Sequence, residues 1–285
     1  MGYFYTIFAR FLASLGQGVG GQVSFSMAGI FLLSLPVCFS FSAYTMAILH
    51  KKFAVVLWVS IIIALFLTMM LGALFSYIYT KVSKDSFTVL CLGSILAFDA
   101  FVRSFDSLTG GVLGISGILR PESIRTLPAL VQFSFFVLIV ILVAHYLVLK
   151  SPMGRKIRAF KEHPVALQAF GVSQKSVISF VIIGGSLLSG ISGLLEVFRI
   201  QFLDPSFGGI PNLIVLVSIS ILALKPKVKA VVLASMLVVF LPELISFLDF
   251  PSALLGHLRV LLYSVLLIVL IHTISGKSQF QKREI

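Results

Sequence analysis

Long apolar runs separated by short polar gaps are the feature that most constrains how this chain can fold. From Phe53 to Tyr79 the sequence holds no charged residue, and the run stops only at Lys81. A helix of about 20 mostly apolar residues is enough to cross roughly 30 Å of hydrocarbon. The 285 residues are 59% hydrophobic and 11% charged, whereas soluble domains carry about 25% charged residues. The sequence therefore predicts an all-α, polytopic transmembrane helical bundle.

The other apolar runs predict further spans of the same kind. A weak run at 3–15 contains Arg10 and merges into a glycine-rich patch, and the run at 213–224 is too short to cross alone at about 1.5 Å per residue. We expect this short run either to borrow residues from the preceding loop or to be a broken helix, as found near transporter sites. Together the runs predict about eight or nine spans in a single transmembrane domain, 1–285. The remaining runs are 25–49, 86–102, 129–149, 177–198, 230–248 and 258–274.

The net charge of +12 is confined to the gaps between apolar runs. A nucleic-acid partner needs basic residues gathered on one polar face, so we expect no nucleic acid. When Lys and Arg are counted on alternate sides of the predicted spans, the side that holds residues 150–176 receives fourteen and the other side seven. Because cytoplasmic loops carry the excess of Lys and Arg, the basic loop at 150–176 and the carboxyl terminus are predicted to be cytoplasmic.

This basic loop has helical signals of its own. Arg155, Lys156, Arg158 and Lys161 fall within two helical turns, Pro164 marks a helix break or start, and a second helical patch ends at Gly171. A loop that only fixes topology needs these charges but no apolar residues. The apolar residues of the loop therefore favour docking against another protein; they are Ile157, Phe160, Leu167 and Phe170.

Four stretches in order resemble permease subunits of branched-chain amino acid-type ABC transporters, an inner-membrane translocator family. Residues 151–162 and 166–172 resemble its cytoplasmic loop, and Gly21-Gln22-Val23-Ser24-Phe25 its amino-proximal motif. Asp106-Ser107-Leu108-Thr109-Gly110-Gly111 and Leu241-Pro242-Glu243-Leu244 resemble two later elements. The chain departs from the family at Met27, where a His is usual, and at 224–229, where glycines give way to lysines. These departures bear on the cargo more than on the architecture.

The resemblance implies a multi-pass protein of the bacterial plasma (inner) membrane that imports branched-chain amino acids. The implied partners are two ABC ATPase subunits, a second permease subunit in a homo- or heterodimer, an extracytoplasmic substrate-binding protein and membrane lipid. The chain has no phosphate-binding Gly-x-x-x-x-Gly-Lys-Ser/Thr motif, so we expect no catalytic residues and no cofactor here, with ATP and Mg in the ATPases. The loop would couple to the ATPase through Gly154, Arg155, Arg158, Ala159, Glu162, Ala166, Ala169, Phe170 and Gly171.

The translocation path is predicted along 16–26 and 109–117, where glycine permits irregular backbone that can line a cavity. For the second stretch an ordinary flexible loop is an equal alternative. Asp99 and Glu196 lie four and three residues before an arginine, so local ion pairs explain both, whereas Glu243 has no cation near it in sequence. The predicted pathway residues are Gln22, Ser24, Ser26, Thr109, Gly110, Gly111 and Glu243.

Other readings stay open at this point. Related permeases carry urea, amides, sugars or nucleosides, and a secondary transporter or channel would work without an ATPase. An intramembrane enzyme is disfavoured because the five His are dispersed and no metal-ligand cluster is evident. Cys38 and Cys91 lie in apolar runs and predict inert packing. Small residues spaced by four, such as Ser186 with Gly190, predict close helix packing.

Overall fold

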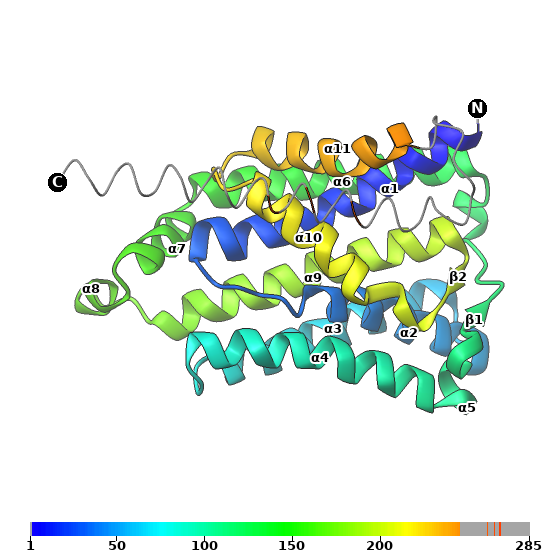
Figure 1. Ribbon diagram of the computed structural model, residues 1–285, viewed down its shortest axis with the longest axis horizontal. Helices are drawn as coiled ribbons and strands as arrows, with labels where there is room; N and C mark the ends of the chain where they lie inside the picture. Colours follow the sequence, from blue (N-terminus) through cyan, green and yellow to red (C-terminus); the bar gives the residue numbers. More distant parts are fainter. Residues whose placement is uncertain (1, 246–260, 262–264, 266–267, 269–285) are drawn as a thin grey trace.

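The apolar runs fold as long helices that lie side by side (Figure 1). The computed structural model describes residues 2–245 and the single positions 261, 265 and 268. The predicted run at 258–274, apart from these three positions, and the last residues of the run at 230–248 lie outside the described residues. The long helices are α1 (Gly2–Gly21), α2 (Leu35–Lys52), α3 (Leu57–Tyr79), α4 (Lys84–Ser104), α6 (Leu127–Lys150), α9 (Gln174–Ile200), α10 (Ile210–Leu222) and α11 (Val228–Ile245).

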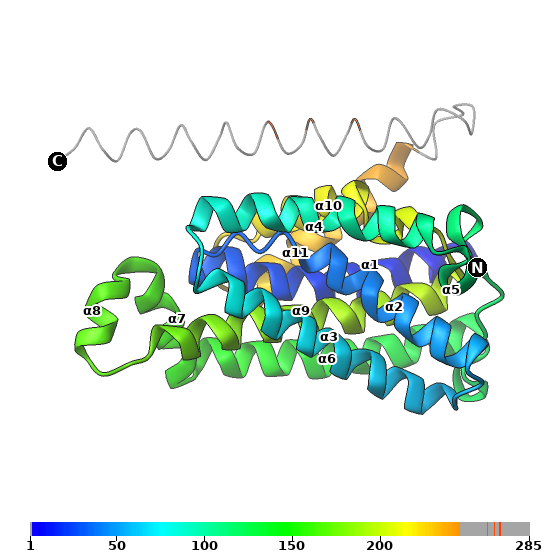
Figure 2. The same cartoon turned by 90° about the horizontal axis from the view of Figure 1, so that it is seen from below.

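The two ends of the bundle carry different short elements, as Figures 1 and 2 both show. Helices α7 (Pro152–Glu162) and α8 (Pro164–Ala169) project from one end, which we call the α7–α8 end. Strands β1 (Ile115–Ser116) and β2 (Phe202–Leu203) pair antiparallel at the other, the β1–β2 end. The same end holds α5 (Asp106–Thr109) and the 3-10 turns η2 (Gly111–Leu113), η3 (Glu122–Ile124) and η4 (Pro205–Gly208).

Five segments within the described part are long and apolar enough to cross a membrane: α3, α4, α6, α9 and the continuous stretch Pro205–Leu222. In α3 and α4 only 22% of the most apolar window is buried, whereas in α9 the share is 61%. Large apolar side chains such as Ile62, Phe66 and Phe136 are exposed on the peripheral helices. Contiguous apolar surface of this extent suits lipid and not water, so the protein is an all-α, multi-pass membrane protein with α9 near its centre.

Small residues let the neighbouring helices approach α9 closely, as the four-residue spacing predicts. The Ser42 hydroxyl donates to the Gly190 carbonyl at 2.8 Å, and the Ser189 hydroxyl to the Leu35 carbonyl at 2.6 Å. A Cβ atom on Gly193 would overlap the carbonyl oxygen of Phe39. The glycines and serines of α9 therefore serve packing against α2, α3 and α1.

The amino-terminal quarter differs from the expected single run at 25–49. Helix α1 continues through the glycine patch and passes into a π-helix, η1 (Gln22–Ala28), which ends at Gly29 with φ +65°. Pro36 then occupies the first turn of α2, where its missing N–H costs nothing. The glycines at 16–21 are thus helical and packed, and the irregular backbone predicted for this stretch is confined to η1.

The short run at 213–224 folds as part of α10, which begins at Ile210 directly after the 3-10 turn η4. Both alternatives for this run are observed. The stretch long enough to span begins at Pro205 and so includes 205–212 of the preceding loop, and it changes from a 3-10 turn to an α-helix at Gly209. A broken span of this kind is common where a transporter binds its cargo.

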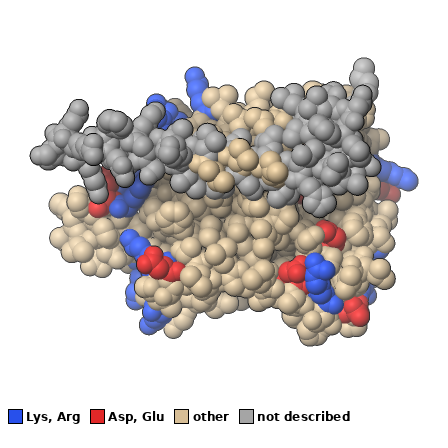
Figure 3. Space-filling view, viewed as in Figure 1, with Lys and Arg blue, Asp and Glu red and all other residues tan. Residues whose placement is uncertain are grey.

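On the face shown in Figure 3, the charged residues lie toward the two ends of the bundle, and the described surface between them is uncharged. The described basic residues lie at the two ends as the predicted alternation requires, whereas Arg259, Lys277, Lys282 and Arg283 lie outside the described residues. At the first end lie Lys81, Lys84, Lys150, Arg155, Lys156, Arg158, Lys161, Lys175, Lys225, Lys227 and Lys229, and at the second Lys51, Lys52, Arg103, Arg120, Arg125 and Arg199.

Candidate functional site

The projecting pair α7 and α8 is built by ordinary capping chemistry. The Ser151 hydroxyl accepts from the Gly154 amide at 3.1 Å, Pro152 opens α7, and Pro164 opens α8. Gly154 is buried, and a Cβ atom there would overlap the Val148 carbonyl oxygen at the end of α6, so the close turn requires glycine. The two short helices predicted in the basic loop are therefore present, and their positions are fixed by the turn out of α6.

Most of the predicted coupling residues share the exposed surface of this pair. Gly154 is buried and Arg158 half-buried, with its guanidinium donating to the Leu149 carbonyl at 3.2 Å. Phe170 is 85% exposed and Val165 is 77% exposed, which is unusual for side chains outside the lipid-facing helices. We call these two residues and the exposed coupling residues the coupling face. The exposed coupling residues are Arg155, Ala159, Glu162, Ala166, Ala169, Phe170 and Gly171.

Three of the four apolar residues predicted to dock a partner are buried, so that prediction is wrong for them. Ile157, Phe160 and Leu167 are buried in the bundle's own core with residues of η1, α3 and α9. They hold α7 and α8 against the membrane domain and so are not available to a partner. Of the four apolar residues named for docking, only Phe170 is exposed.

The predicted pathway residues at 22–26 lie at the α7–α8 end. The Gln22 amide nitrogen donates to the carbonyls of Ala223 at 3.0 Å and Lys225 at 2.9 Å, and its oxygen lies 2.8 Å from His145 Nε2. The Ser24 hydroxyl donates to the Gly20 carbonyl, and the Ser26 hydroxyl to the Leu224 carbonyl. All three side chains are buried, so this stretch ties α1 to α6 and to the loop before α11.

The π-helix η1 also contacts the projecting pair directly. Lys161 of α7 donates from Nζ to the Ser26 carbonyl at 2.9 Å. A Cβ atom on Gly29 would lie 3.1 Å from the Lys161 side chain. A movement of α7 would therefore act first on η1 and, because α1 and η1 are continuous, on α1.

The predicted residues at 109–111 lie at the β1–β2 end. The buried Thr109 hydroxyl lies 2.6 Å from the Val102 carbonyl and 2.7 Å from the Phe105 carbonyl. Gly110 and Gly111 have φ angles of +77° and +55°, a region that favours glycine. These hydrogen bonds and φ angles give the stretch a defined tight turn that joins α4 to η2.

Arg120 fastens the nearby loop to α9. Its guanidinium donates to the Phe198 carbonyl at 2.6 Å and to the Arg199 carbonyl at 3.1 Å, which satisfies carbonyls left free at the helix end. Burial lowers the pKa of Arg120, but an arginine stays charged at physiological pH. The positive charge also complements the negative end of the helix dipole.

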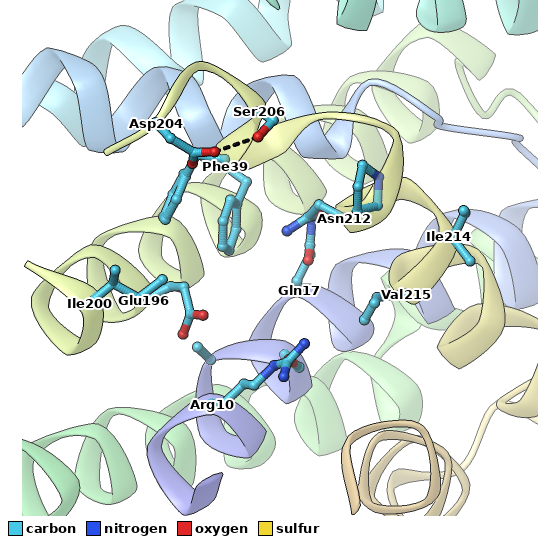
Figure 4. Close-up of a pocket in the computed structure, with 14 residues that line it drawn as sticks. Arg10, Gln17, Phe39, Glu196, Ile200, Asp204, Ser206, Asn212, Ile214 and Val215 are labelled. Atoms are coloured by element: carbon cyan, nitrogen blue, oxygen red, sulfur yellow. Dashed lines mark hydrogen bonds between the residues drawn. The ribbon is translucent and has the colours of Figure 1, made fainter. Parts of the chain in front are cut away.

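A polar pocket of about 340 Å³ opens between α1, α9 and α10, toward the β1–β2 end (Figure 4). Its charged residues, Arg10, Glu196 and Asp204, come from three different segments around one cavity. Between them the Gln17 amide donates to the Asn212 side-chain oxygen at 2.8 Å. The rest of the wall includes Phe39, Ile200, Phe207, Ile214 and Val215.

The ion pairs of this region are partly those predicted. Arg199 binds Glu196 in a bidentate pair at 2.6 and 2.9 Å, and Arg103 binds Asp99 at 2.8 Å, so both local pairs are confirmed. Glu243, which has no nearby cation in sequence, lies 3.4 Å from an Arg10 nitrogen and accepts from the Tyr3 hydroxyl at 2.6 Å. It therefore pairs across 233 residues of sequence.

The pocket was not predicted from the sequence. Arg10 entered only as an interruption of an apolar run, and Glu196 only as half of a local pair. The available signal was Arg10 itself, because an arginine inside an apolar segment marks a functional candidate. None of the seven individually named pathway residues lines the pocket, although Gln17, inside the predicted stretch 16–26, does. The described residues contain no cluster of potential metal ligands.

Comparison with known proteins places these features in one protein family. A family profile described as "Branched-chain amino acid transport system / permease component" matches residues 5–271, nearly the whole chain. The chain belongs to this family. Membership in this permease family agrees with the apolar, multi-pass helices and with the motifs at both ends of the sequence.

Two curated permeases are similar to the chain. The high-affinity branched-chain amino acid transport system permease protein LivM of Escherichia coli K12 is 24% identical over 273 residues, which cover 86% of this chain and 64% of LivM. LivM of Salmonella typhimurium LT2 is 23% identical over the same shares. The chain thus spans just under two thirds of the length of these relatives. No solved structure matches it.

Proposed function

We propose that this permease is the membrane subunit of an ATP-driven importer of branched-chain amino acids, coupled to a separate ATPase through α7 and α8. The coupling face carries the proposal. It projects beyond the bundle (Figure 2), and it presents two almost fully exposed apolar side chains beside charged and small residues. Surfaces of this composition suit a protein partner.

The proposed assembly contains two ABC ATPase subunits, a second permease subunit and an extracytoplasmic substrate-binding protein in a bacterial inner membrane. ATP and Mg bind in the ATPases, and this chain does no chemistry. The concentration of lysine and arginine at the α7–α8 end supports a cytoplasmic position for that end, because positive loops are retained inside. The β1–β2 end would then face the binding protein.

The direction of force transfer follows from the contacts. The coupling face receives the ATPase, α7 holds η1 through Lys161, and η1 continues into α1, which lines the polar pocket. Movement at the cytoplasmic end therefore has a continuous helical route to a cavity at the opposite end. Alternating access would use this route.

A charge reversal on the coupling face tests the proposal. Arg155→Glu places a negative charge on an exposed position whose side chain makes no hydrogen bond within the described residues, unlike Arg158, which donates to the Leu149 carbonyl of α6. We expect ATPase co-purification and ATP-driven leucine uptake to fall roughly tenfold or more, as for an interface residue worth at least about 1.4 kcal/mol.

Lys156→Glu is the matched control, because it makes the same charge change at an exposed position of the same helix outside the coupling face. It should retain most ATPase association. Equal association of wild type and both variants would show that α7 does not dock the ATPase. Uptake of urea or a sugar in place of leucine would be consistent with this transporter class but would show that the assignment of branched-chain amino acids as the cargo is wrong.

A further inference from the structure

The polar pocket combines, in one small volume, both charges and an apolar wall. Its volume of about 340 Å³ lies at the lower end of the range for ligand pockets, about 300–1,000 Å³. The size favours a small solute over a lipid or an oligosaccharide. The cationic and anionic groups on its wall suit a solute that carries both charges.

We infer that this pocket binds the transported amino acid, with Arg10 receiving the carboxylate and Asp204 the ammonium group. The inference rests on the proposed function and adds to it a location and named residues. Ile200, Ile214 and Val215 would then contact the apolar side chain of the solute. Gln17 and Asn212, already joined to each other, supply hydrogen-bonding groups between the two charged ends.

Arg10 is the guanidinium that can turn toward a ligand. It meets Glu243 through a single nitrogen at 3.4 Å, whereas Arg199 holds Glu196 at 2.6 and 2.9 Å through two. The Arg10 side chain is 29% exposed and that of Arg199 is 15% exposed. Short bidentate pairs are the strong ones, so the long single contact of Arg10 is the one that a solute carboxylate can replace.

Asp204 is the carboxylate available to an ammonium group. It accepts a hydrogen bond from the Ser206 hydroxyl and, within the described residues, forms no ion pair with a lysine or arginine. Glu196 lines the same pocket but is already neutralised by Arg199. The pocket therefore offers one exchangeable positive group and one unneutralised negative group.

Binding in this way would exchange one ion pair for another. When Arg10 turns to the solute, Glu243 of α11 loses its arginine partner, which loosens a contact between α1 and α11. Solute binding would thus change the packing of α1, the helix that η1 connects to α7 and the coupling face. Because Glu243 and the solute carboxylate compete for Arg10, removal of the Glu243 charge should strengthen solute binding. Removal of the Arg10 charge should weaken it.

The test is protection of a single cysteine inside the pocket. Ser14 lines the pocket, while both native cysteines are buried in the bundle, so Ser14→Cys in the full chain gives a selective target for a charged methanethiosulfonate reagent. In lipid nanodiscs, millimolar leucine should slow labelling of S14C. Ser123→Cys, exposed at the same end outside the pocket, should label at the same rate with and without leucine.

Second substitutions in the S14C background assign the roles. Arg10→Gln should raise the leucine concentration needed for half-protection roughly 10- to 100-fold, as expected for loss of a charge-assisted hydrogen bond, and Arg10→Lys should be intermediate. Glu243→Gln should lower that concentration. Tyr3→Phe removes a neutral hydrogen bond to Glu243 and should leave the half-protecting leucine concentration unchanged, which separates charge competition from local disruption.

The outcomes separate this inference from the proposed function. If leucine does not slow S14C labelling, or if Arg10→Gln protects like wild type, the pocket is not the solute site, even where ATP-driven uptake is intact. If protection follows the predicted order while no ATPase drives uptake, the pocket assignment stands and the proposed coupling is wrong. Isopentylamine, which lacks the carboxylate, should protect S14C much less than leucine does.

Discussion

At the scale of single residues, packing around α9 depends on the absence of side chains at particular positions. Gly193 faces the backbone of α2 so closely that a Cβ atom would overlap the Phe39 carbonyl oxygen. Gly184, nine residues earlier on the same helix, has no neighbouring atom of the described residues within 4 Å of the position a Cβ would take. A side chain is therefore excluded at position 193 of α9 but has room at position 184.

Gly193→Val should destabilise the protein, because α2 and α9 would have to separate. Overpacking of this kind costs about 1–3 kcal/mol, sometimes more, which exceeds the roughly 1 kcal/mol gained when glycine leaves a helix interior. The measurement is the thermal unfolding midpoint in detergent. Gly184→Val is the control and should stay within about 1 kcal/mol of wild type; equal loss in both variants would refute the close approach at Gly193.

At the scale of elements, η1 is the joint between the membrane bundle and the projecting pair. A π-helical segment is rare and frequently marks a functional position. Here the Gln22 side chain satisfies groups from α6 and from the loop after α10, while Lys161 of α7 binds the η1 backbone. Three segments are thus fixed at one short stretch of chain.

Gln22→Met should break this joint while keeping a side chain of similar length. The carbonyls of Ala223 and Lys225 and the ring of His145 would lose a partner, and each unsatisfied buried group costs about 1–3 kcal/mol. We expect a clearly lower unfolding midpoint. Gln168→Met, on the exposed surface of α8, should change it by no more than about 0.5 kcal/mol. Unchanged stability of the first variant would show that the Gln22 contacts are dispensable.

At the scale of the whole molecule, the sequence predicted the long helices, the division of basic residues between the two ends of the bundle and the two short helices of the projecting pair. These features follow from apolar length, charge alternation and local capping signals. The cytoplasmic position of the α7–α8 end stays a prediction. The pairs Asp99–Arg103 and Glu196–Arg199 were equally predictable, since their partners lie one helical turn apart. The Arg10–Glu243 pair and the polar pocket depend on which helices pack together. One sequence holds no local signal for such packing, and the predicted total of eight or nine spans stays a prediction.

The central claim is that this permease moves its solute only when a separate ATPase acts on the α7–α8 end. The most direct measurement is leucine uptake into proteoliposomes that contain the permease with or without its ATPase, second permease and binding-protein partners. We expect uptake only when the ATPase, the second permease and the binding protein are all present and ATP is supplied on the side of the membrane where the ATPase lies. Sustained uptake by the permease alone, without ATP, would contradict it and indicate a secondary transporter or channel.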